Sequence, residues 1–105
     1  MDHSGTITVA AGQIAARFMN DAEATLAALD AAITEAHRQG ADLLVLPECA
    51  YPAYLLGSVA SYRAGGHMSG EAFVGWLGQR AARCRMHIVS GFVDDGGEQL
   101  HNAAV

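Results

Sequence analysis

The sequence predicts an α/β fold in which two helices pack against a mostly buried sheet, in the order β-α-β-α-β-β. Short apolar runs with β-branched residues, at residues 6–12, 42–46 and 87–93, are typical of buried parallel strands. Segments with helical periodicity separate these runs, and the joints between them are short. Strands that alternate with helices in this way form a sheet with helices packed on it.

The first helix is expected to begin at Asn20 and to end at Gly40. Asn20 as the N-cap, with Glu23 three residues later, approximates a capping box. Gly40 suits the position just after the last helical turn. Between these ends, apolar residues keep the helical period and form one stripe: Ala22, Leu26, Leu29, Ile33 and Ala36.

Residues 42–46 (DLLVL) form the expected central strand, which Pro47 ends because proline cannot donate to a strand ladder. With the first strand and helix they make a βαβ unit, for which a right-handed crossover is expected. Residues 48–68 are expected to form a long irregular loop, and a loop of this length is usually functional or mobile. It holds three tyrosines that either line the mouth of a pocket or anchor the loop: Tyr51, Tyr54 and Tyr62.

The second half of the chain predicts one more helix and a hairpin. Ser69 suits the N-cap of the helix, whose apolar stripe comprises Val74, Leu77, Ala81 and Cys84. Residues 87–93 are expected as a third strand. Residues 94–97 (DDGG) indicate a hairpin turn, and residues 99–105 then form a fourth strand antiparallel to the third.

Composition and charge exclude several classes of protein. The 105 residues are 51% hydrophobic, which argues against disorder. The formal net charge is −5 and all six basic residues are arginine, so the clustered basic surface that binds nucleic acid is not expected. No stretch reaches the ~20 apolar residues of a membrane span, and the N-terminus lacks the basic region of a signal peptide. These features predict a cytoplasmic protein that binds neither nucleic acid nor a membrane.

The cysteines and histidines do not predict a metal site. Two cysteines are too few for a disulfide framework, and reduced thiols are expected in the cytoplasm. Cys84 and His87 have a C-x-x-H spacing. Neither His3 nor the other histidines form the second pair of ligands that would complete a zinc site. Glycine-rich phosphate-binding motifs are also missing. These patterns therefore predict neither a zinc site nor a phosphate-binding loop.

Glu48 is the strongest candidate for chemistry. It lies just past the carboxyl end of a buried strand and opens the long loop, and ligands of open α/β sheets bind at that edge. A carboxylate that is partly desolvated there suits a general base; the alternative is a solvated acid that caps the loop. Cys49 is expected to face away from Glu48, because neighbouring side chains of an extended backbone point to opposite faces, and to be a small buried hydrophobe rather than a nucleophile.

Several segments together resemble the N-terminal part of the carbon–nitrogen hydrolase family, the nitrilase superfamily. The most specific is 40–48 (GADLLVLPE), an apolar strand that ends in Pro-Glu. It follows 7–13 (ITVAAGQ), which is similar to the first strand of the family, and precedes 51–54 (YPAY), similar to its aromatic loop. Residues 88–92 (IVSGF) and 100–105 (LHNAAV) resemble the next hairpin of the family, with Asn102 at the position of its usual asparagine.

The resemblance implies an αββα sandwich, of which this chain supplies half, and a Glu-Lys-Cys triad that hydrolyses nitriles or amides without a cofactor. Glu48 matches the general base of the triad, and Tyr54 is the residue of the aromatic loop expected to contact substrate. The lysine and the nucleophilic cysteine have no counterpart here, because the chain has no lysine and neither of its cysteines is at the nucleophile's place. Residues 1–105 are therefore expected to be an incomplete, N-terminal part of one hydrolase domain.

Four further expectations follow from the resemblance and from this incompleteness. The chain alone is expected to be inactive. The sheet face that the second sheet of the sandwich would cover is expected to stay exposed and prone to association. The full-length form is expected to be a homo-oligomer, and its reading frame to continue into a lysine and then a cysteine.

Two other hypotheses remain. A non-catalytic binding or interaction module that keeps the half-fold predicts a stable, monodisperse protein whose binding tolerates Glu48→Gln. An unrelated doubly wound domain that binds a small ligand ranks last, because the phosphate-binding glycine signature is missing.

Overall fold

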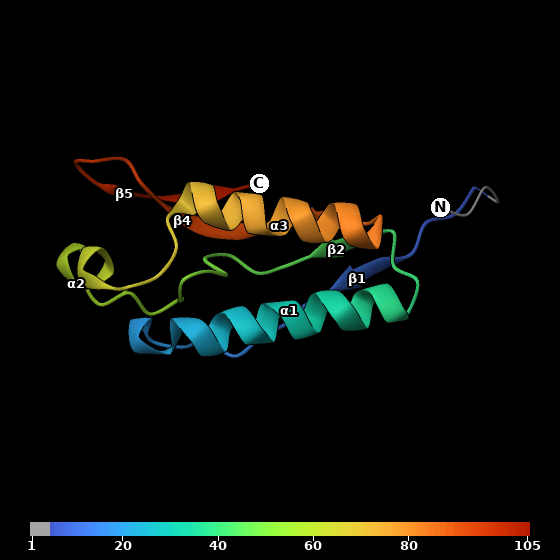
Figure 1. Cartoon of the computed structure of the whole chain (residues 1–105), viewed down its shortest axis with the longest axis horizontal. Helices are drawn as coiled ribbons and strands as arrows, with labels where there is room; N and C mark the ends of the chain where they lie inside the picture. Colours follow the sequence, from blue (N-terminus) through green and yellow to red (C-terminus); the bar gives the residue numbers. More distant parts are fainter. Residues whose placement is uncertain (1–4) are drawn as a thin grey trace.

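The computed structural model describes residues 5–105, so His3 and the first residues considered for a signal peptide lie outside the described part. The chain has an α/β fold with two small sheets (Figure 1). In chain order its elements are β1 (Val9–Ala11), the 3-10 helix η1 (Met19–Asp21), α1 (Ala22–Arg38), β2 (Leu43–Val45), α2 (Val59–Ala64), α3 (Gly70–Cys84), β3 (His87–Val89), β4 (Gly91–Asp95) and β5 (Leu100–Ala104).

The first sheet is parallel, with the order β1-β2-β3, and β2 is its central strand, as predicted. In its middle register Ala10 lies beside Leu44, and Leu44 beside Ile88. Leu44 is buried, and Ala10 and Ile88 pack against the same core. This row of side chains therefore forms the sheet's contribution to the hydrophobic core.

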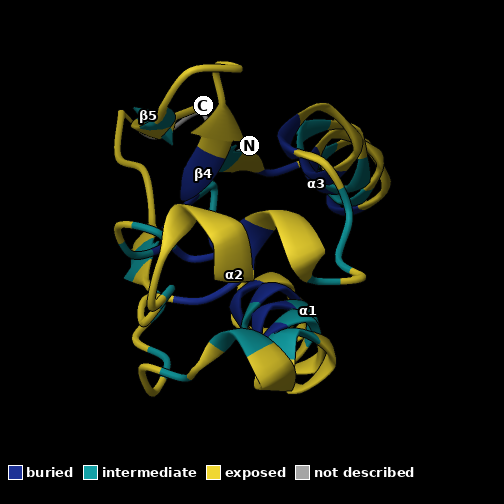
Figure 2. Ribbon diagram, turned by 90° about the vertical axis from the view of Figure 1, so that its left-hand side faces the viewer, coloured by how far each residue is buried: buried dark blue, intermediate teal, exposed yellow. Residues whose placement is uncertain are grey.

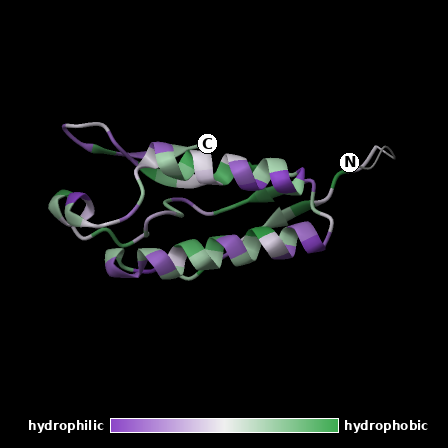
Figure 3. Cartoon of the chain, viewed as in Figure 1, coloured by the Kyte–Doolittle hydropathy of each residue, from purple (hydrophilic) through white to green (hydrophobic). Residues whose placement is uncertain are grey.

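Helices α1 and α3 run along the sheet and supply the rest of that core (Figure 1). Leu29 and Ile33 of α1 and Phe73 and Leu77 of α3 are buried, while the outer faces of both helices are exposed (Figure 2). The helices alternate hydrophilic and hydrophobic residues in the same way, whereas β1 and β2 are mainly hydrophobic (Figure 3). The helical periodicity of the sequence thus predicts much of the buried stripe. Phe73 and Thr25 are buried although they lie outside the predicted stripes, whereas Val74 and Ala81 are only partly buried.

The other face of the parallel sheet is exposed. Val9, Val45 and Val89, one on each strand, have exposed fractions of 53%, 40% and 44%. The prediction of a mostly buried sheet is therefore wrong for this face, because side chains alternate across a strand and both helices contact the side that carries Leu44. The separate expectation of an exposed apolar face is confirmed for residues 5–105.

The two ends of α1 differ in how well the sequence predicts them. The capping box is wrong: the helix begins at Ala22 after the 3-10 turn, Asp21 is its N-cap, and no side chain caps it. At the other end Gly40 has φ +78°, its N–H donates to the His37 carbonyl, and the Ala41 N–H donates to the Ala36 carbonyl. This pair of bonds is a Schellman motif, for which glycine is favoured because it adopts positive φ without a penalty.

Serine caps begin the other two helices. The Ser69 hydroxyl accepts from the Ala72 N–H at the start of α3, as predicted. Ser58 caps α2 in the same way by accepting from the Ser61 N–H, so residues 48–68 are not one irregular loop. A six-residue helix with one charged residue has too short a pattern to stand out in the sequence.

The predicted strand 87–93 is divided between the two sheets at Ser90. Strand β3 pairs with β2, whereas β4 forms an antiparallel hairpin with β5, with Val93 opposite Asn102. Ser90 and Val105 exchange both backbone hydrogen bonds, at 2.9 and 3.0 Å, next to the end of the hairpin. The element order β-α-β-α-β-β is thus altered by this division and by α2, while the predicted hairpin is confirmed. Within residues 5–105 no helix is long and apolar enough to cross a membrane.

Candidate active site

Glu48 lies in a segment that is fixed by backbone hydrogen bonds to β4. After β2 ends, the Leu46 N–H donates to the Val89 carbonyl, and the Gly91 N–H donates to the Pro47 carbonyl. Two further bonds follow, from the Ala50 N–H to the Gly91 carbonyl and from the Val93 N–H to the Tyr51 carbonyl. The backbone on both sides of Glu48 is therefore held against a strand that lies more than 40 residues later in the chain.

Gly91 permits this close approach. A Cβ at residue 91 would lie 2.7 Å from Glu48 Cα, 2.8 Å from the Cys49 nitrogen and 2.9 Å from the Pro47 oxygen. All three are backbone atoms, so they cannot move aside by a change of rotamer. Sequence reasoning missed this role of Gly91, and only its place within an apolar strand hinted at a close backbone contact.

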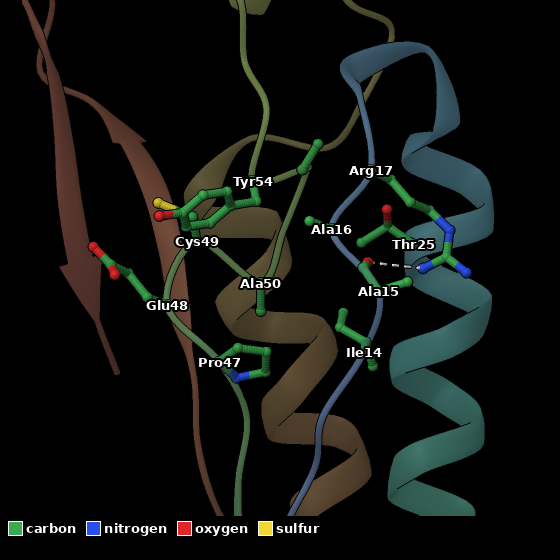
Figure 4. Close-up of a pocket in the computed structure, with 11 residues that line it drawn as sticks. Ile14, Ala15, Ala16, Arg17, Thr25, Pro47, Glu48, Cys49, Ala50 and Tyr54 are labelled. Atoms are coloured by element: carbon green, nitrogen blue, oxygen red, sulfur yellow. Dashed lines mark hydrogen bonds between the residues drawn. The ribbon is translucent and has the colours of Figure 1, made fainter.

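The Glu48 carboxylate contacts β5. It accepts a hydrogen bond of 2.5 Å from the Asn102 side-chain amide, Nδ2 to Oε1. Glu48 points toward the hairpin and away from α1 (Figure 4). Glu48 is exposed in the part of the chain that the structure describes, residues 5–105. The expectation that its carboxylate is partly desolvated is therefore wrong there. The loop expected to cover it packs elsewhere, since Tyr51 stacks on Phe73 of α3.

Cys49 contacts the same asparagine. Its Sγ lies 3.7 Å from Asn102 Oδ1, and its φ is +46°, in the left-handed region. The expectation that Cys49 faces away from the surroundings of Glu48 is therefore wrong, because it assumed an extended backbone. Burial raises the pKa of the Cys49 thiol, and the nearby negative charge of Glu48 raises it further. Both effects favour the protonated thiol, which is a donor and a poor nucleophile.

A small cavity of about 70 Å³ adjoins this segment. Side chains of Ile14, Ala50 and Ala53 make much of its lining apolar, and Tyr54 lies on its rim with an exposed fraction of 55% (Figure 4). Thr25 of α1 also lines it; this residue is buried and its hydroxyl makes no hydrogen bond with the described residues. The cavity can thus accept a small apolar group. Thr25 had no distinguishing signal in the sequence.

The three tyrosines divide between the two roles left open for them. Tyr51 and Tyr62 are buried and anchor the loop: the Tyr51 hydroxyl accepts from the Met68 N–H at 2.9 Å, and the Tyr62 hydroxyl donates to the Val93 carbonyl at 3.4 Å. Burial raises the pKa of Tyr62, as do the charges of Asp95 and Asp94, so Tyr62 stays a donor at neutral pH. Tyr54 alone of the three lies at the mouth of the cavity.

The remaining candidate residues, Cys84 and His87, do not come together with other side chains to form a site. Cys84 is buried on α3, and His87 lies at an exposed position of β3. Within residues 5–105, no group of three histidine, cysteine or acidic side chains is arranged to hold a metal ion.

The fold and this geometry define a class: an α/β protein with a carboxylate at the carboxyl end of the central parallel strand, tied to a following hairpin and next to a small cavity. The family model for carbon-nitrogen hydrolases matches residues 8–105. The chain therefore belongs to the carbon-nitrogen hydrolase family, as its resemblance predicts. Comparison with curated proteins found no match.

Proposed function

We propose that this chain supplies the general base, Glu48, of a hydrolase that acts on the carbon–nitrogen bond of a nitrile or amide. One observation carries the proposal: in a chain of this family, Glu48 follows the central strand and is fixed there by β4 and Asn102. Substrates of α/β proteins bind at this edge of the sheet. An exposed carboxylate with one amide partner is free to accept a proton from a group brought against it.

The proposed reaction needs two more groups. A cysteine thiol gives its proton to Glu48 and its sulfur attacks the nitrile or amide carbon, which forms a covalent thioimidate or tetrahedral adduct. A lysine stabilises the negative charge that develops on the nitrogen or oxygen of the adduct. For a nitrile, Glu48 returns the proton to the nitrogen as the thioimidate forms, and a first water then displaces this nitrogen as ammonia and leaves a thioester. For an amide, Glu48 returns the proton to the departing amine, which leaves the same thioester. In both cases Glu48 activates the water that releases the acid and restores the thiol.

Neither of these groups is available in this chain. The sequence has no lysine. Cys84 is buried in α3, and the protonated state of Cys49 is favoured by its surroundings. We therefore propose that lysine and nucleophile come from polypeptide outside these 105 residues, and that the chain alone does not turn over substrate.

The same reasoning extends to the fold. We propose that the exposed face with Val9, Val45 and Val89 is the inner face of one half of an αββα sandwich, because three exposed valines on adjacent strands are suited to pack against a second sheet. In the complete, homo-oligomeric cytoplasmic enzyme this second sheet would also enclose Glu48. The cavity beside Tyr54 would then hold the substituent of the substrate, with room for a small apolar group.

The exposed sheet face also favours a second candidate, a non-catalytic interaction module that binds a partner through this face. The two proposals differ in their use of Glu48. Catalysis requires its carboxylate, whereas an apolar interface does not.

The test compares the protein as its gene encodes it, including any sequence after Val105, with the 105-residue chain, each assayed for ammonia release from short aliphatic nitriles and amides. We expect activity only in a form that contains a lysine and a further cysteine, and we expect Glu48→Gln to reduce kcat by roughly 10²–10⁴-fold. Glu98→Gln, the same change at an exposed position of the hairpin turn, is the matched control. Unchanged kcat in Glu48→Gln would show that the base is assigned wrongly.

A further inference from the structure

We propose that Asn102 is a positioning residue that holds the Glu48 carboxylate in one orientation, and that the Cys49 thiol fixes which way the Asn102 amide faces. This inference rests on the proposed function for its catalytic meaning. The three side chains come from the end of β2 and from β5, and they meet only in the folded chain.

The first step concerns what a carboxylate accepts. An ionised carboxylate has only acceptor atoms, so a neutral partner must present an N–H or O–H. Asn102 Nδ2 presents one at 2.5 Å from Oε1, and hydrogen bonds to an ionised acceptor are shorter and stronger than those between neutral groups. Within residues 5–105 this is the one hydrogen bond of the Glu48 side chain. Without it, a flexible exposed side chain would populate several rotamers.

The second step concerns the asparagine itself. Its amide has an oxygen and a nitrogen of nearly the same shape, and the flipped orientation would place Oδ1 against the carboxylate. The Cys49 Sγ lies 3.7 Å from Oδ1 and is a donor when the thiol is protonated. The thiol therefore contacts the end of the amide that cannot donate, and this contact selects the orientation in which Nδ2 faces Glu48.

The third step concerns rigidity. Asn102 lies opposite Val93 in the β4–β5 register, and β4 also carries the backbone bonds to the segment that contains Glu48. Both partners are thus fixed to the same strand from its two sides. A left-handed φ at Cys49 turns its sulfur toward Asn102, which an extended residue at that position would not do.

Nuclear magnetic resonance of the 105-residue protein tests the arrangement without any need for activity. We expect a single Glu48 rotamer from its three-bond couplings and a strongly downfield Asn102 amide proton. Asn102→Ala and Asn102→Asp are expected to average the Glu48 couplings to those of a free side chain. Glu48→Gln is expected to move the Asn102 amide signals upfield, whereas the control Glu98→Gln leaves them in place.

Glu48→Gln keeps the hairpin sequence intact, so it remains informative if an Asn102 variant fails to fold. Cys49→Ala adds an independent check, because loss of the thiol is expected to broaden or double the Asn102 amide signals. Glu48 couplings that stay unchanged in a folded Asn102→Ala, or Asn102 signals that stay unchanged in Glu48→Gln, would overturn the proposal.

A kinetic comparison separates this inference from the proposed function. In the active form, Asn102→Ala is expected to lower kcat roughly 10- to 100-fold with little change in KM, since a displaced catalytic group costs about this much. If Glu48→Gln abolishes activity and Asn102→Ala leaves kcat unchanged, the positioning role is wrong and the function stands. If Glu48→Gln keeps full activity, the function is wrong, and the kinetic role of Asn102 is wrong with it.

Discussion

Replacing Gly91 with alanine is expected to displace the backbone that carries Glu48. The added Cβ would meet three backbone atoms at 2.7–2.9 Å, closer than the 3.0 Å that real Cβ atoms essentially never cross. Gly91 has no positive φ, so the effect is purely steric. The segment must therefore retreat by at least a few tenths of an ångström, which lengthens the hydrogen bonds of Gly91 to Pro47 and Ala50.

We expect Gly91→Ala to lower the free energy of unfolding by about 1–3 kcal/mol, the usual cost of overpacking a closely packed site. Urea unfolding, followed by the fluorescence of the single tryptophan, measures this change. Gly75→Ala is the matched control: Gly75 lies within α3 with open space around it, so alanine is expected to stabilise by up to ~1 kcal/mol. Equal stability of Gly91→Ala and wild type, with the Glu48–Asn102 contact retained, would refute the steric argument.

Three further predictions concern a thiol, an ion pair and the core. Because burial and the Glu48 charge raise the pKa of Cys49, iodoacetamide should label Cys49 more slowly than free cysteine at pH 8. Glu48→Gln should accelerate the labelling, which mass spectrometry measures. An unchanged labelling rate in Glu48→Gln would contradict the proximity of Glu48 and Cys49. The hydrogen bond from Arg63 lowers the pKa of Asp95 in the folded chain. The pair therefore stabilises the fold fully above the pKa of Asp95 in the unfolded chain, and this stabilisation is lost as the pH falls through the lowered pKa of the folded chain. Arg63→Met should therefore move the acid titration of Asp95 to higher pH by NMR, and a fixed midpoint would exclude the pairing. Leu29→Ala, at a fully buried site, should cost about 2–5 kcal/mol in urea unfolding, and a loss under 1 kcal/mol would mean that the core is loose.

The elements that the sequence predicted well are those with a repeated pattern. The stripe through Leu29 and Ile33 buries one helix face, and the apolar run before Pro47 forms the central strand. Gly40 ends α1 because only the left-handed conformation closes that helix end, which is a local requirement. In each of these elements, residues that are close together in the sequence determine the local structure.

The site depended on distant residues, and there the sequence was less informative. Glu48 is exposed because the following loop packs on α3, where Tyr51 stacks on Phe73. The sulfur of Cys49 points toward Asn102 because the backbone of Cys49 has a positive φ. The division of strand 87–93 at Ser90 results from pairing with Val105, which no local pattern indicates. The position of Glu48 at the edge of the sheet was predictable from its place after the central strand. The resemblance marked Asn102 only as the family's usual asparagine, and its contact with Glu48 was not predicted.

The pairing of Glu48 with Asn102 joins residues 54 positions apart, from the first half of the chain and from its last strand. Closing so long a loop has an entropic cost that must be met before the contact can form. The carboxylate is therefore expected to become ordered late in folding, and opening of the β4–β5 hairpin would release it while the helices remain packed. Amide exchange along β5 would then report the fraction of molecules in which the site is assembled.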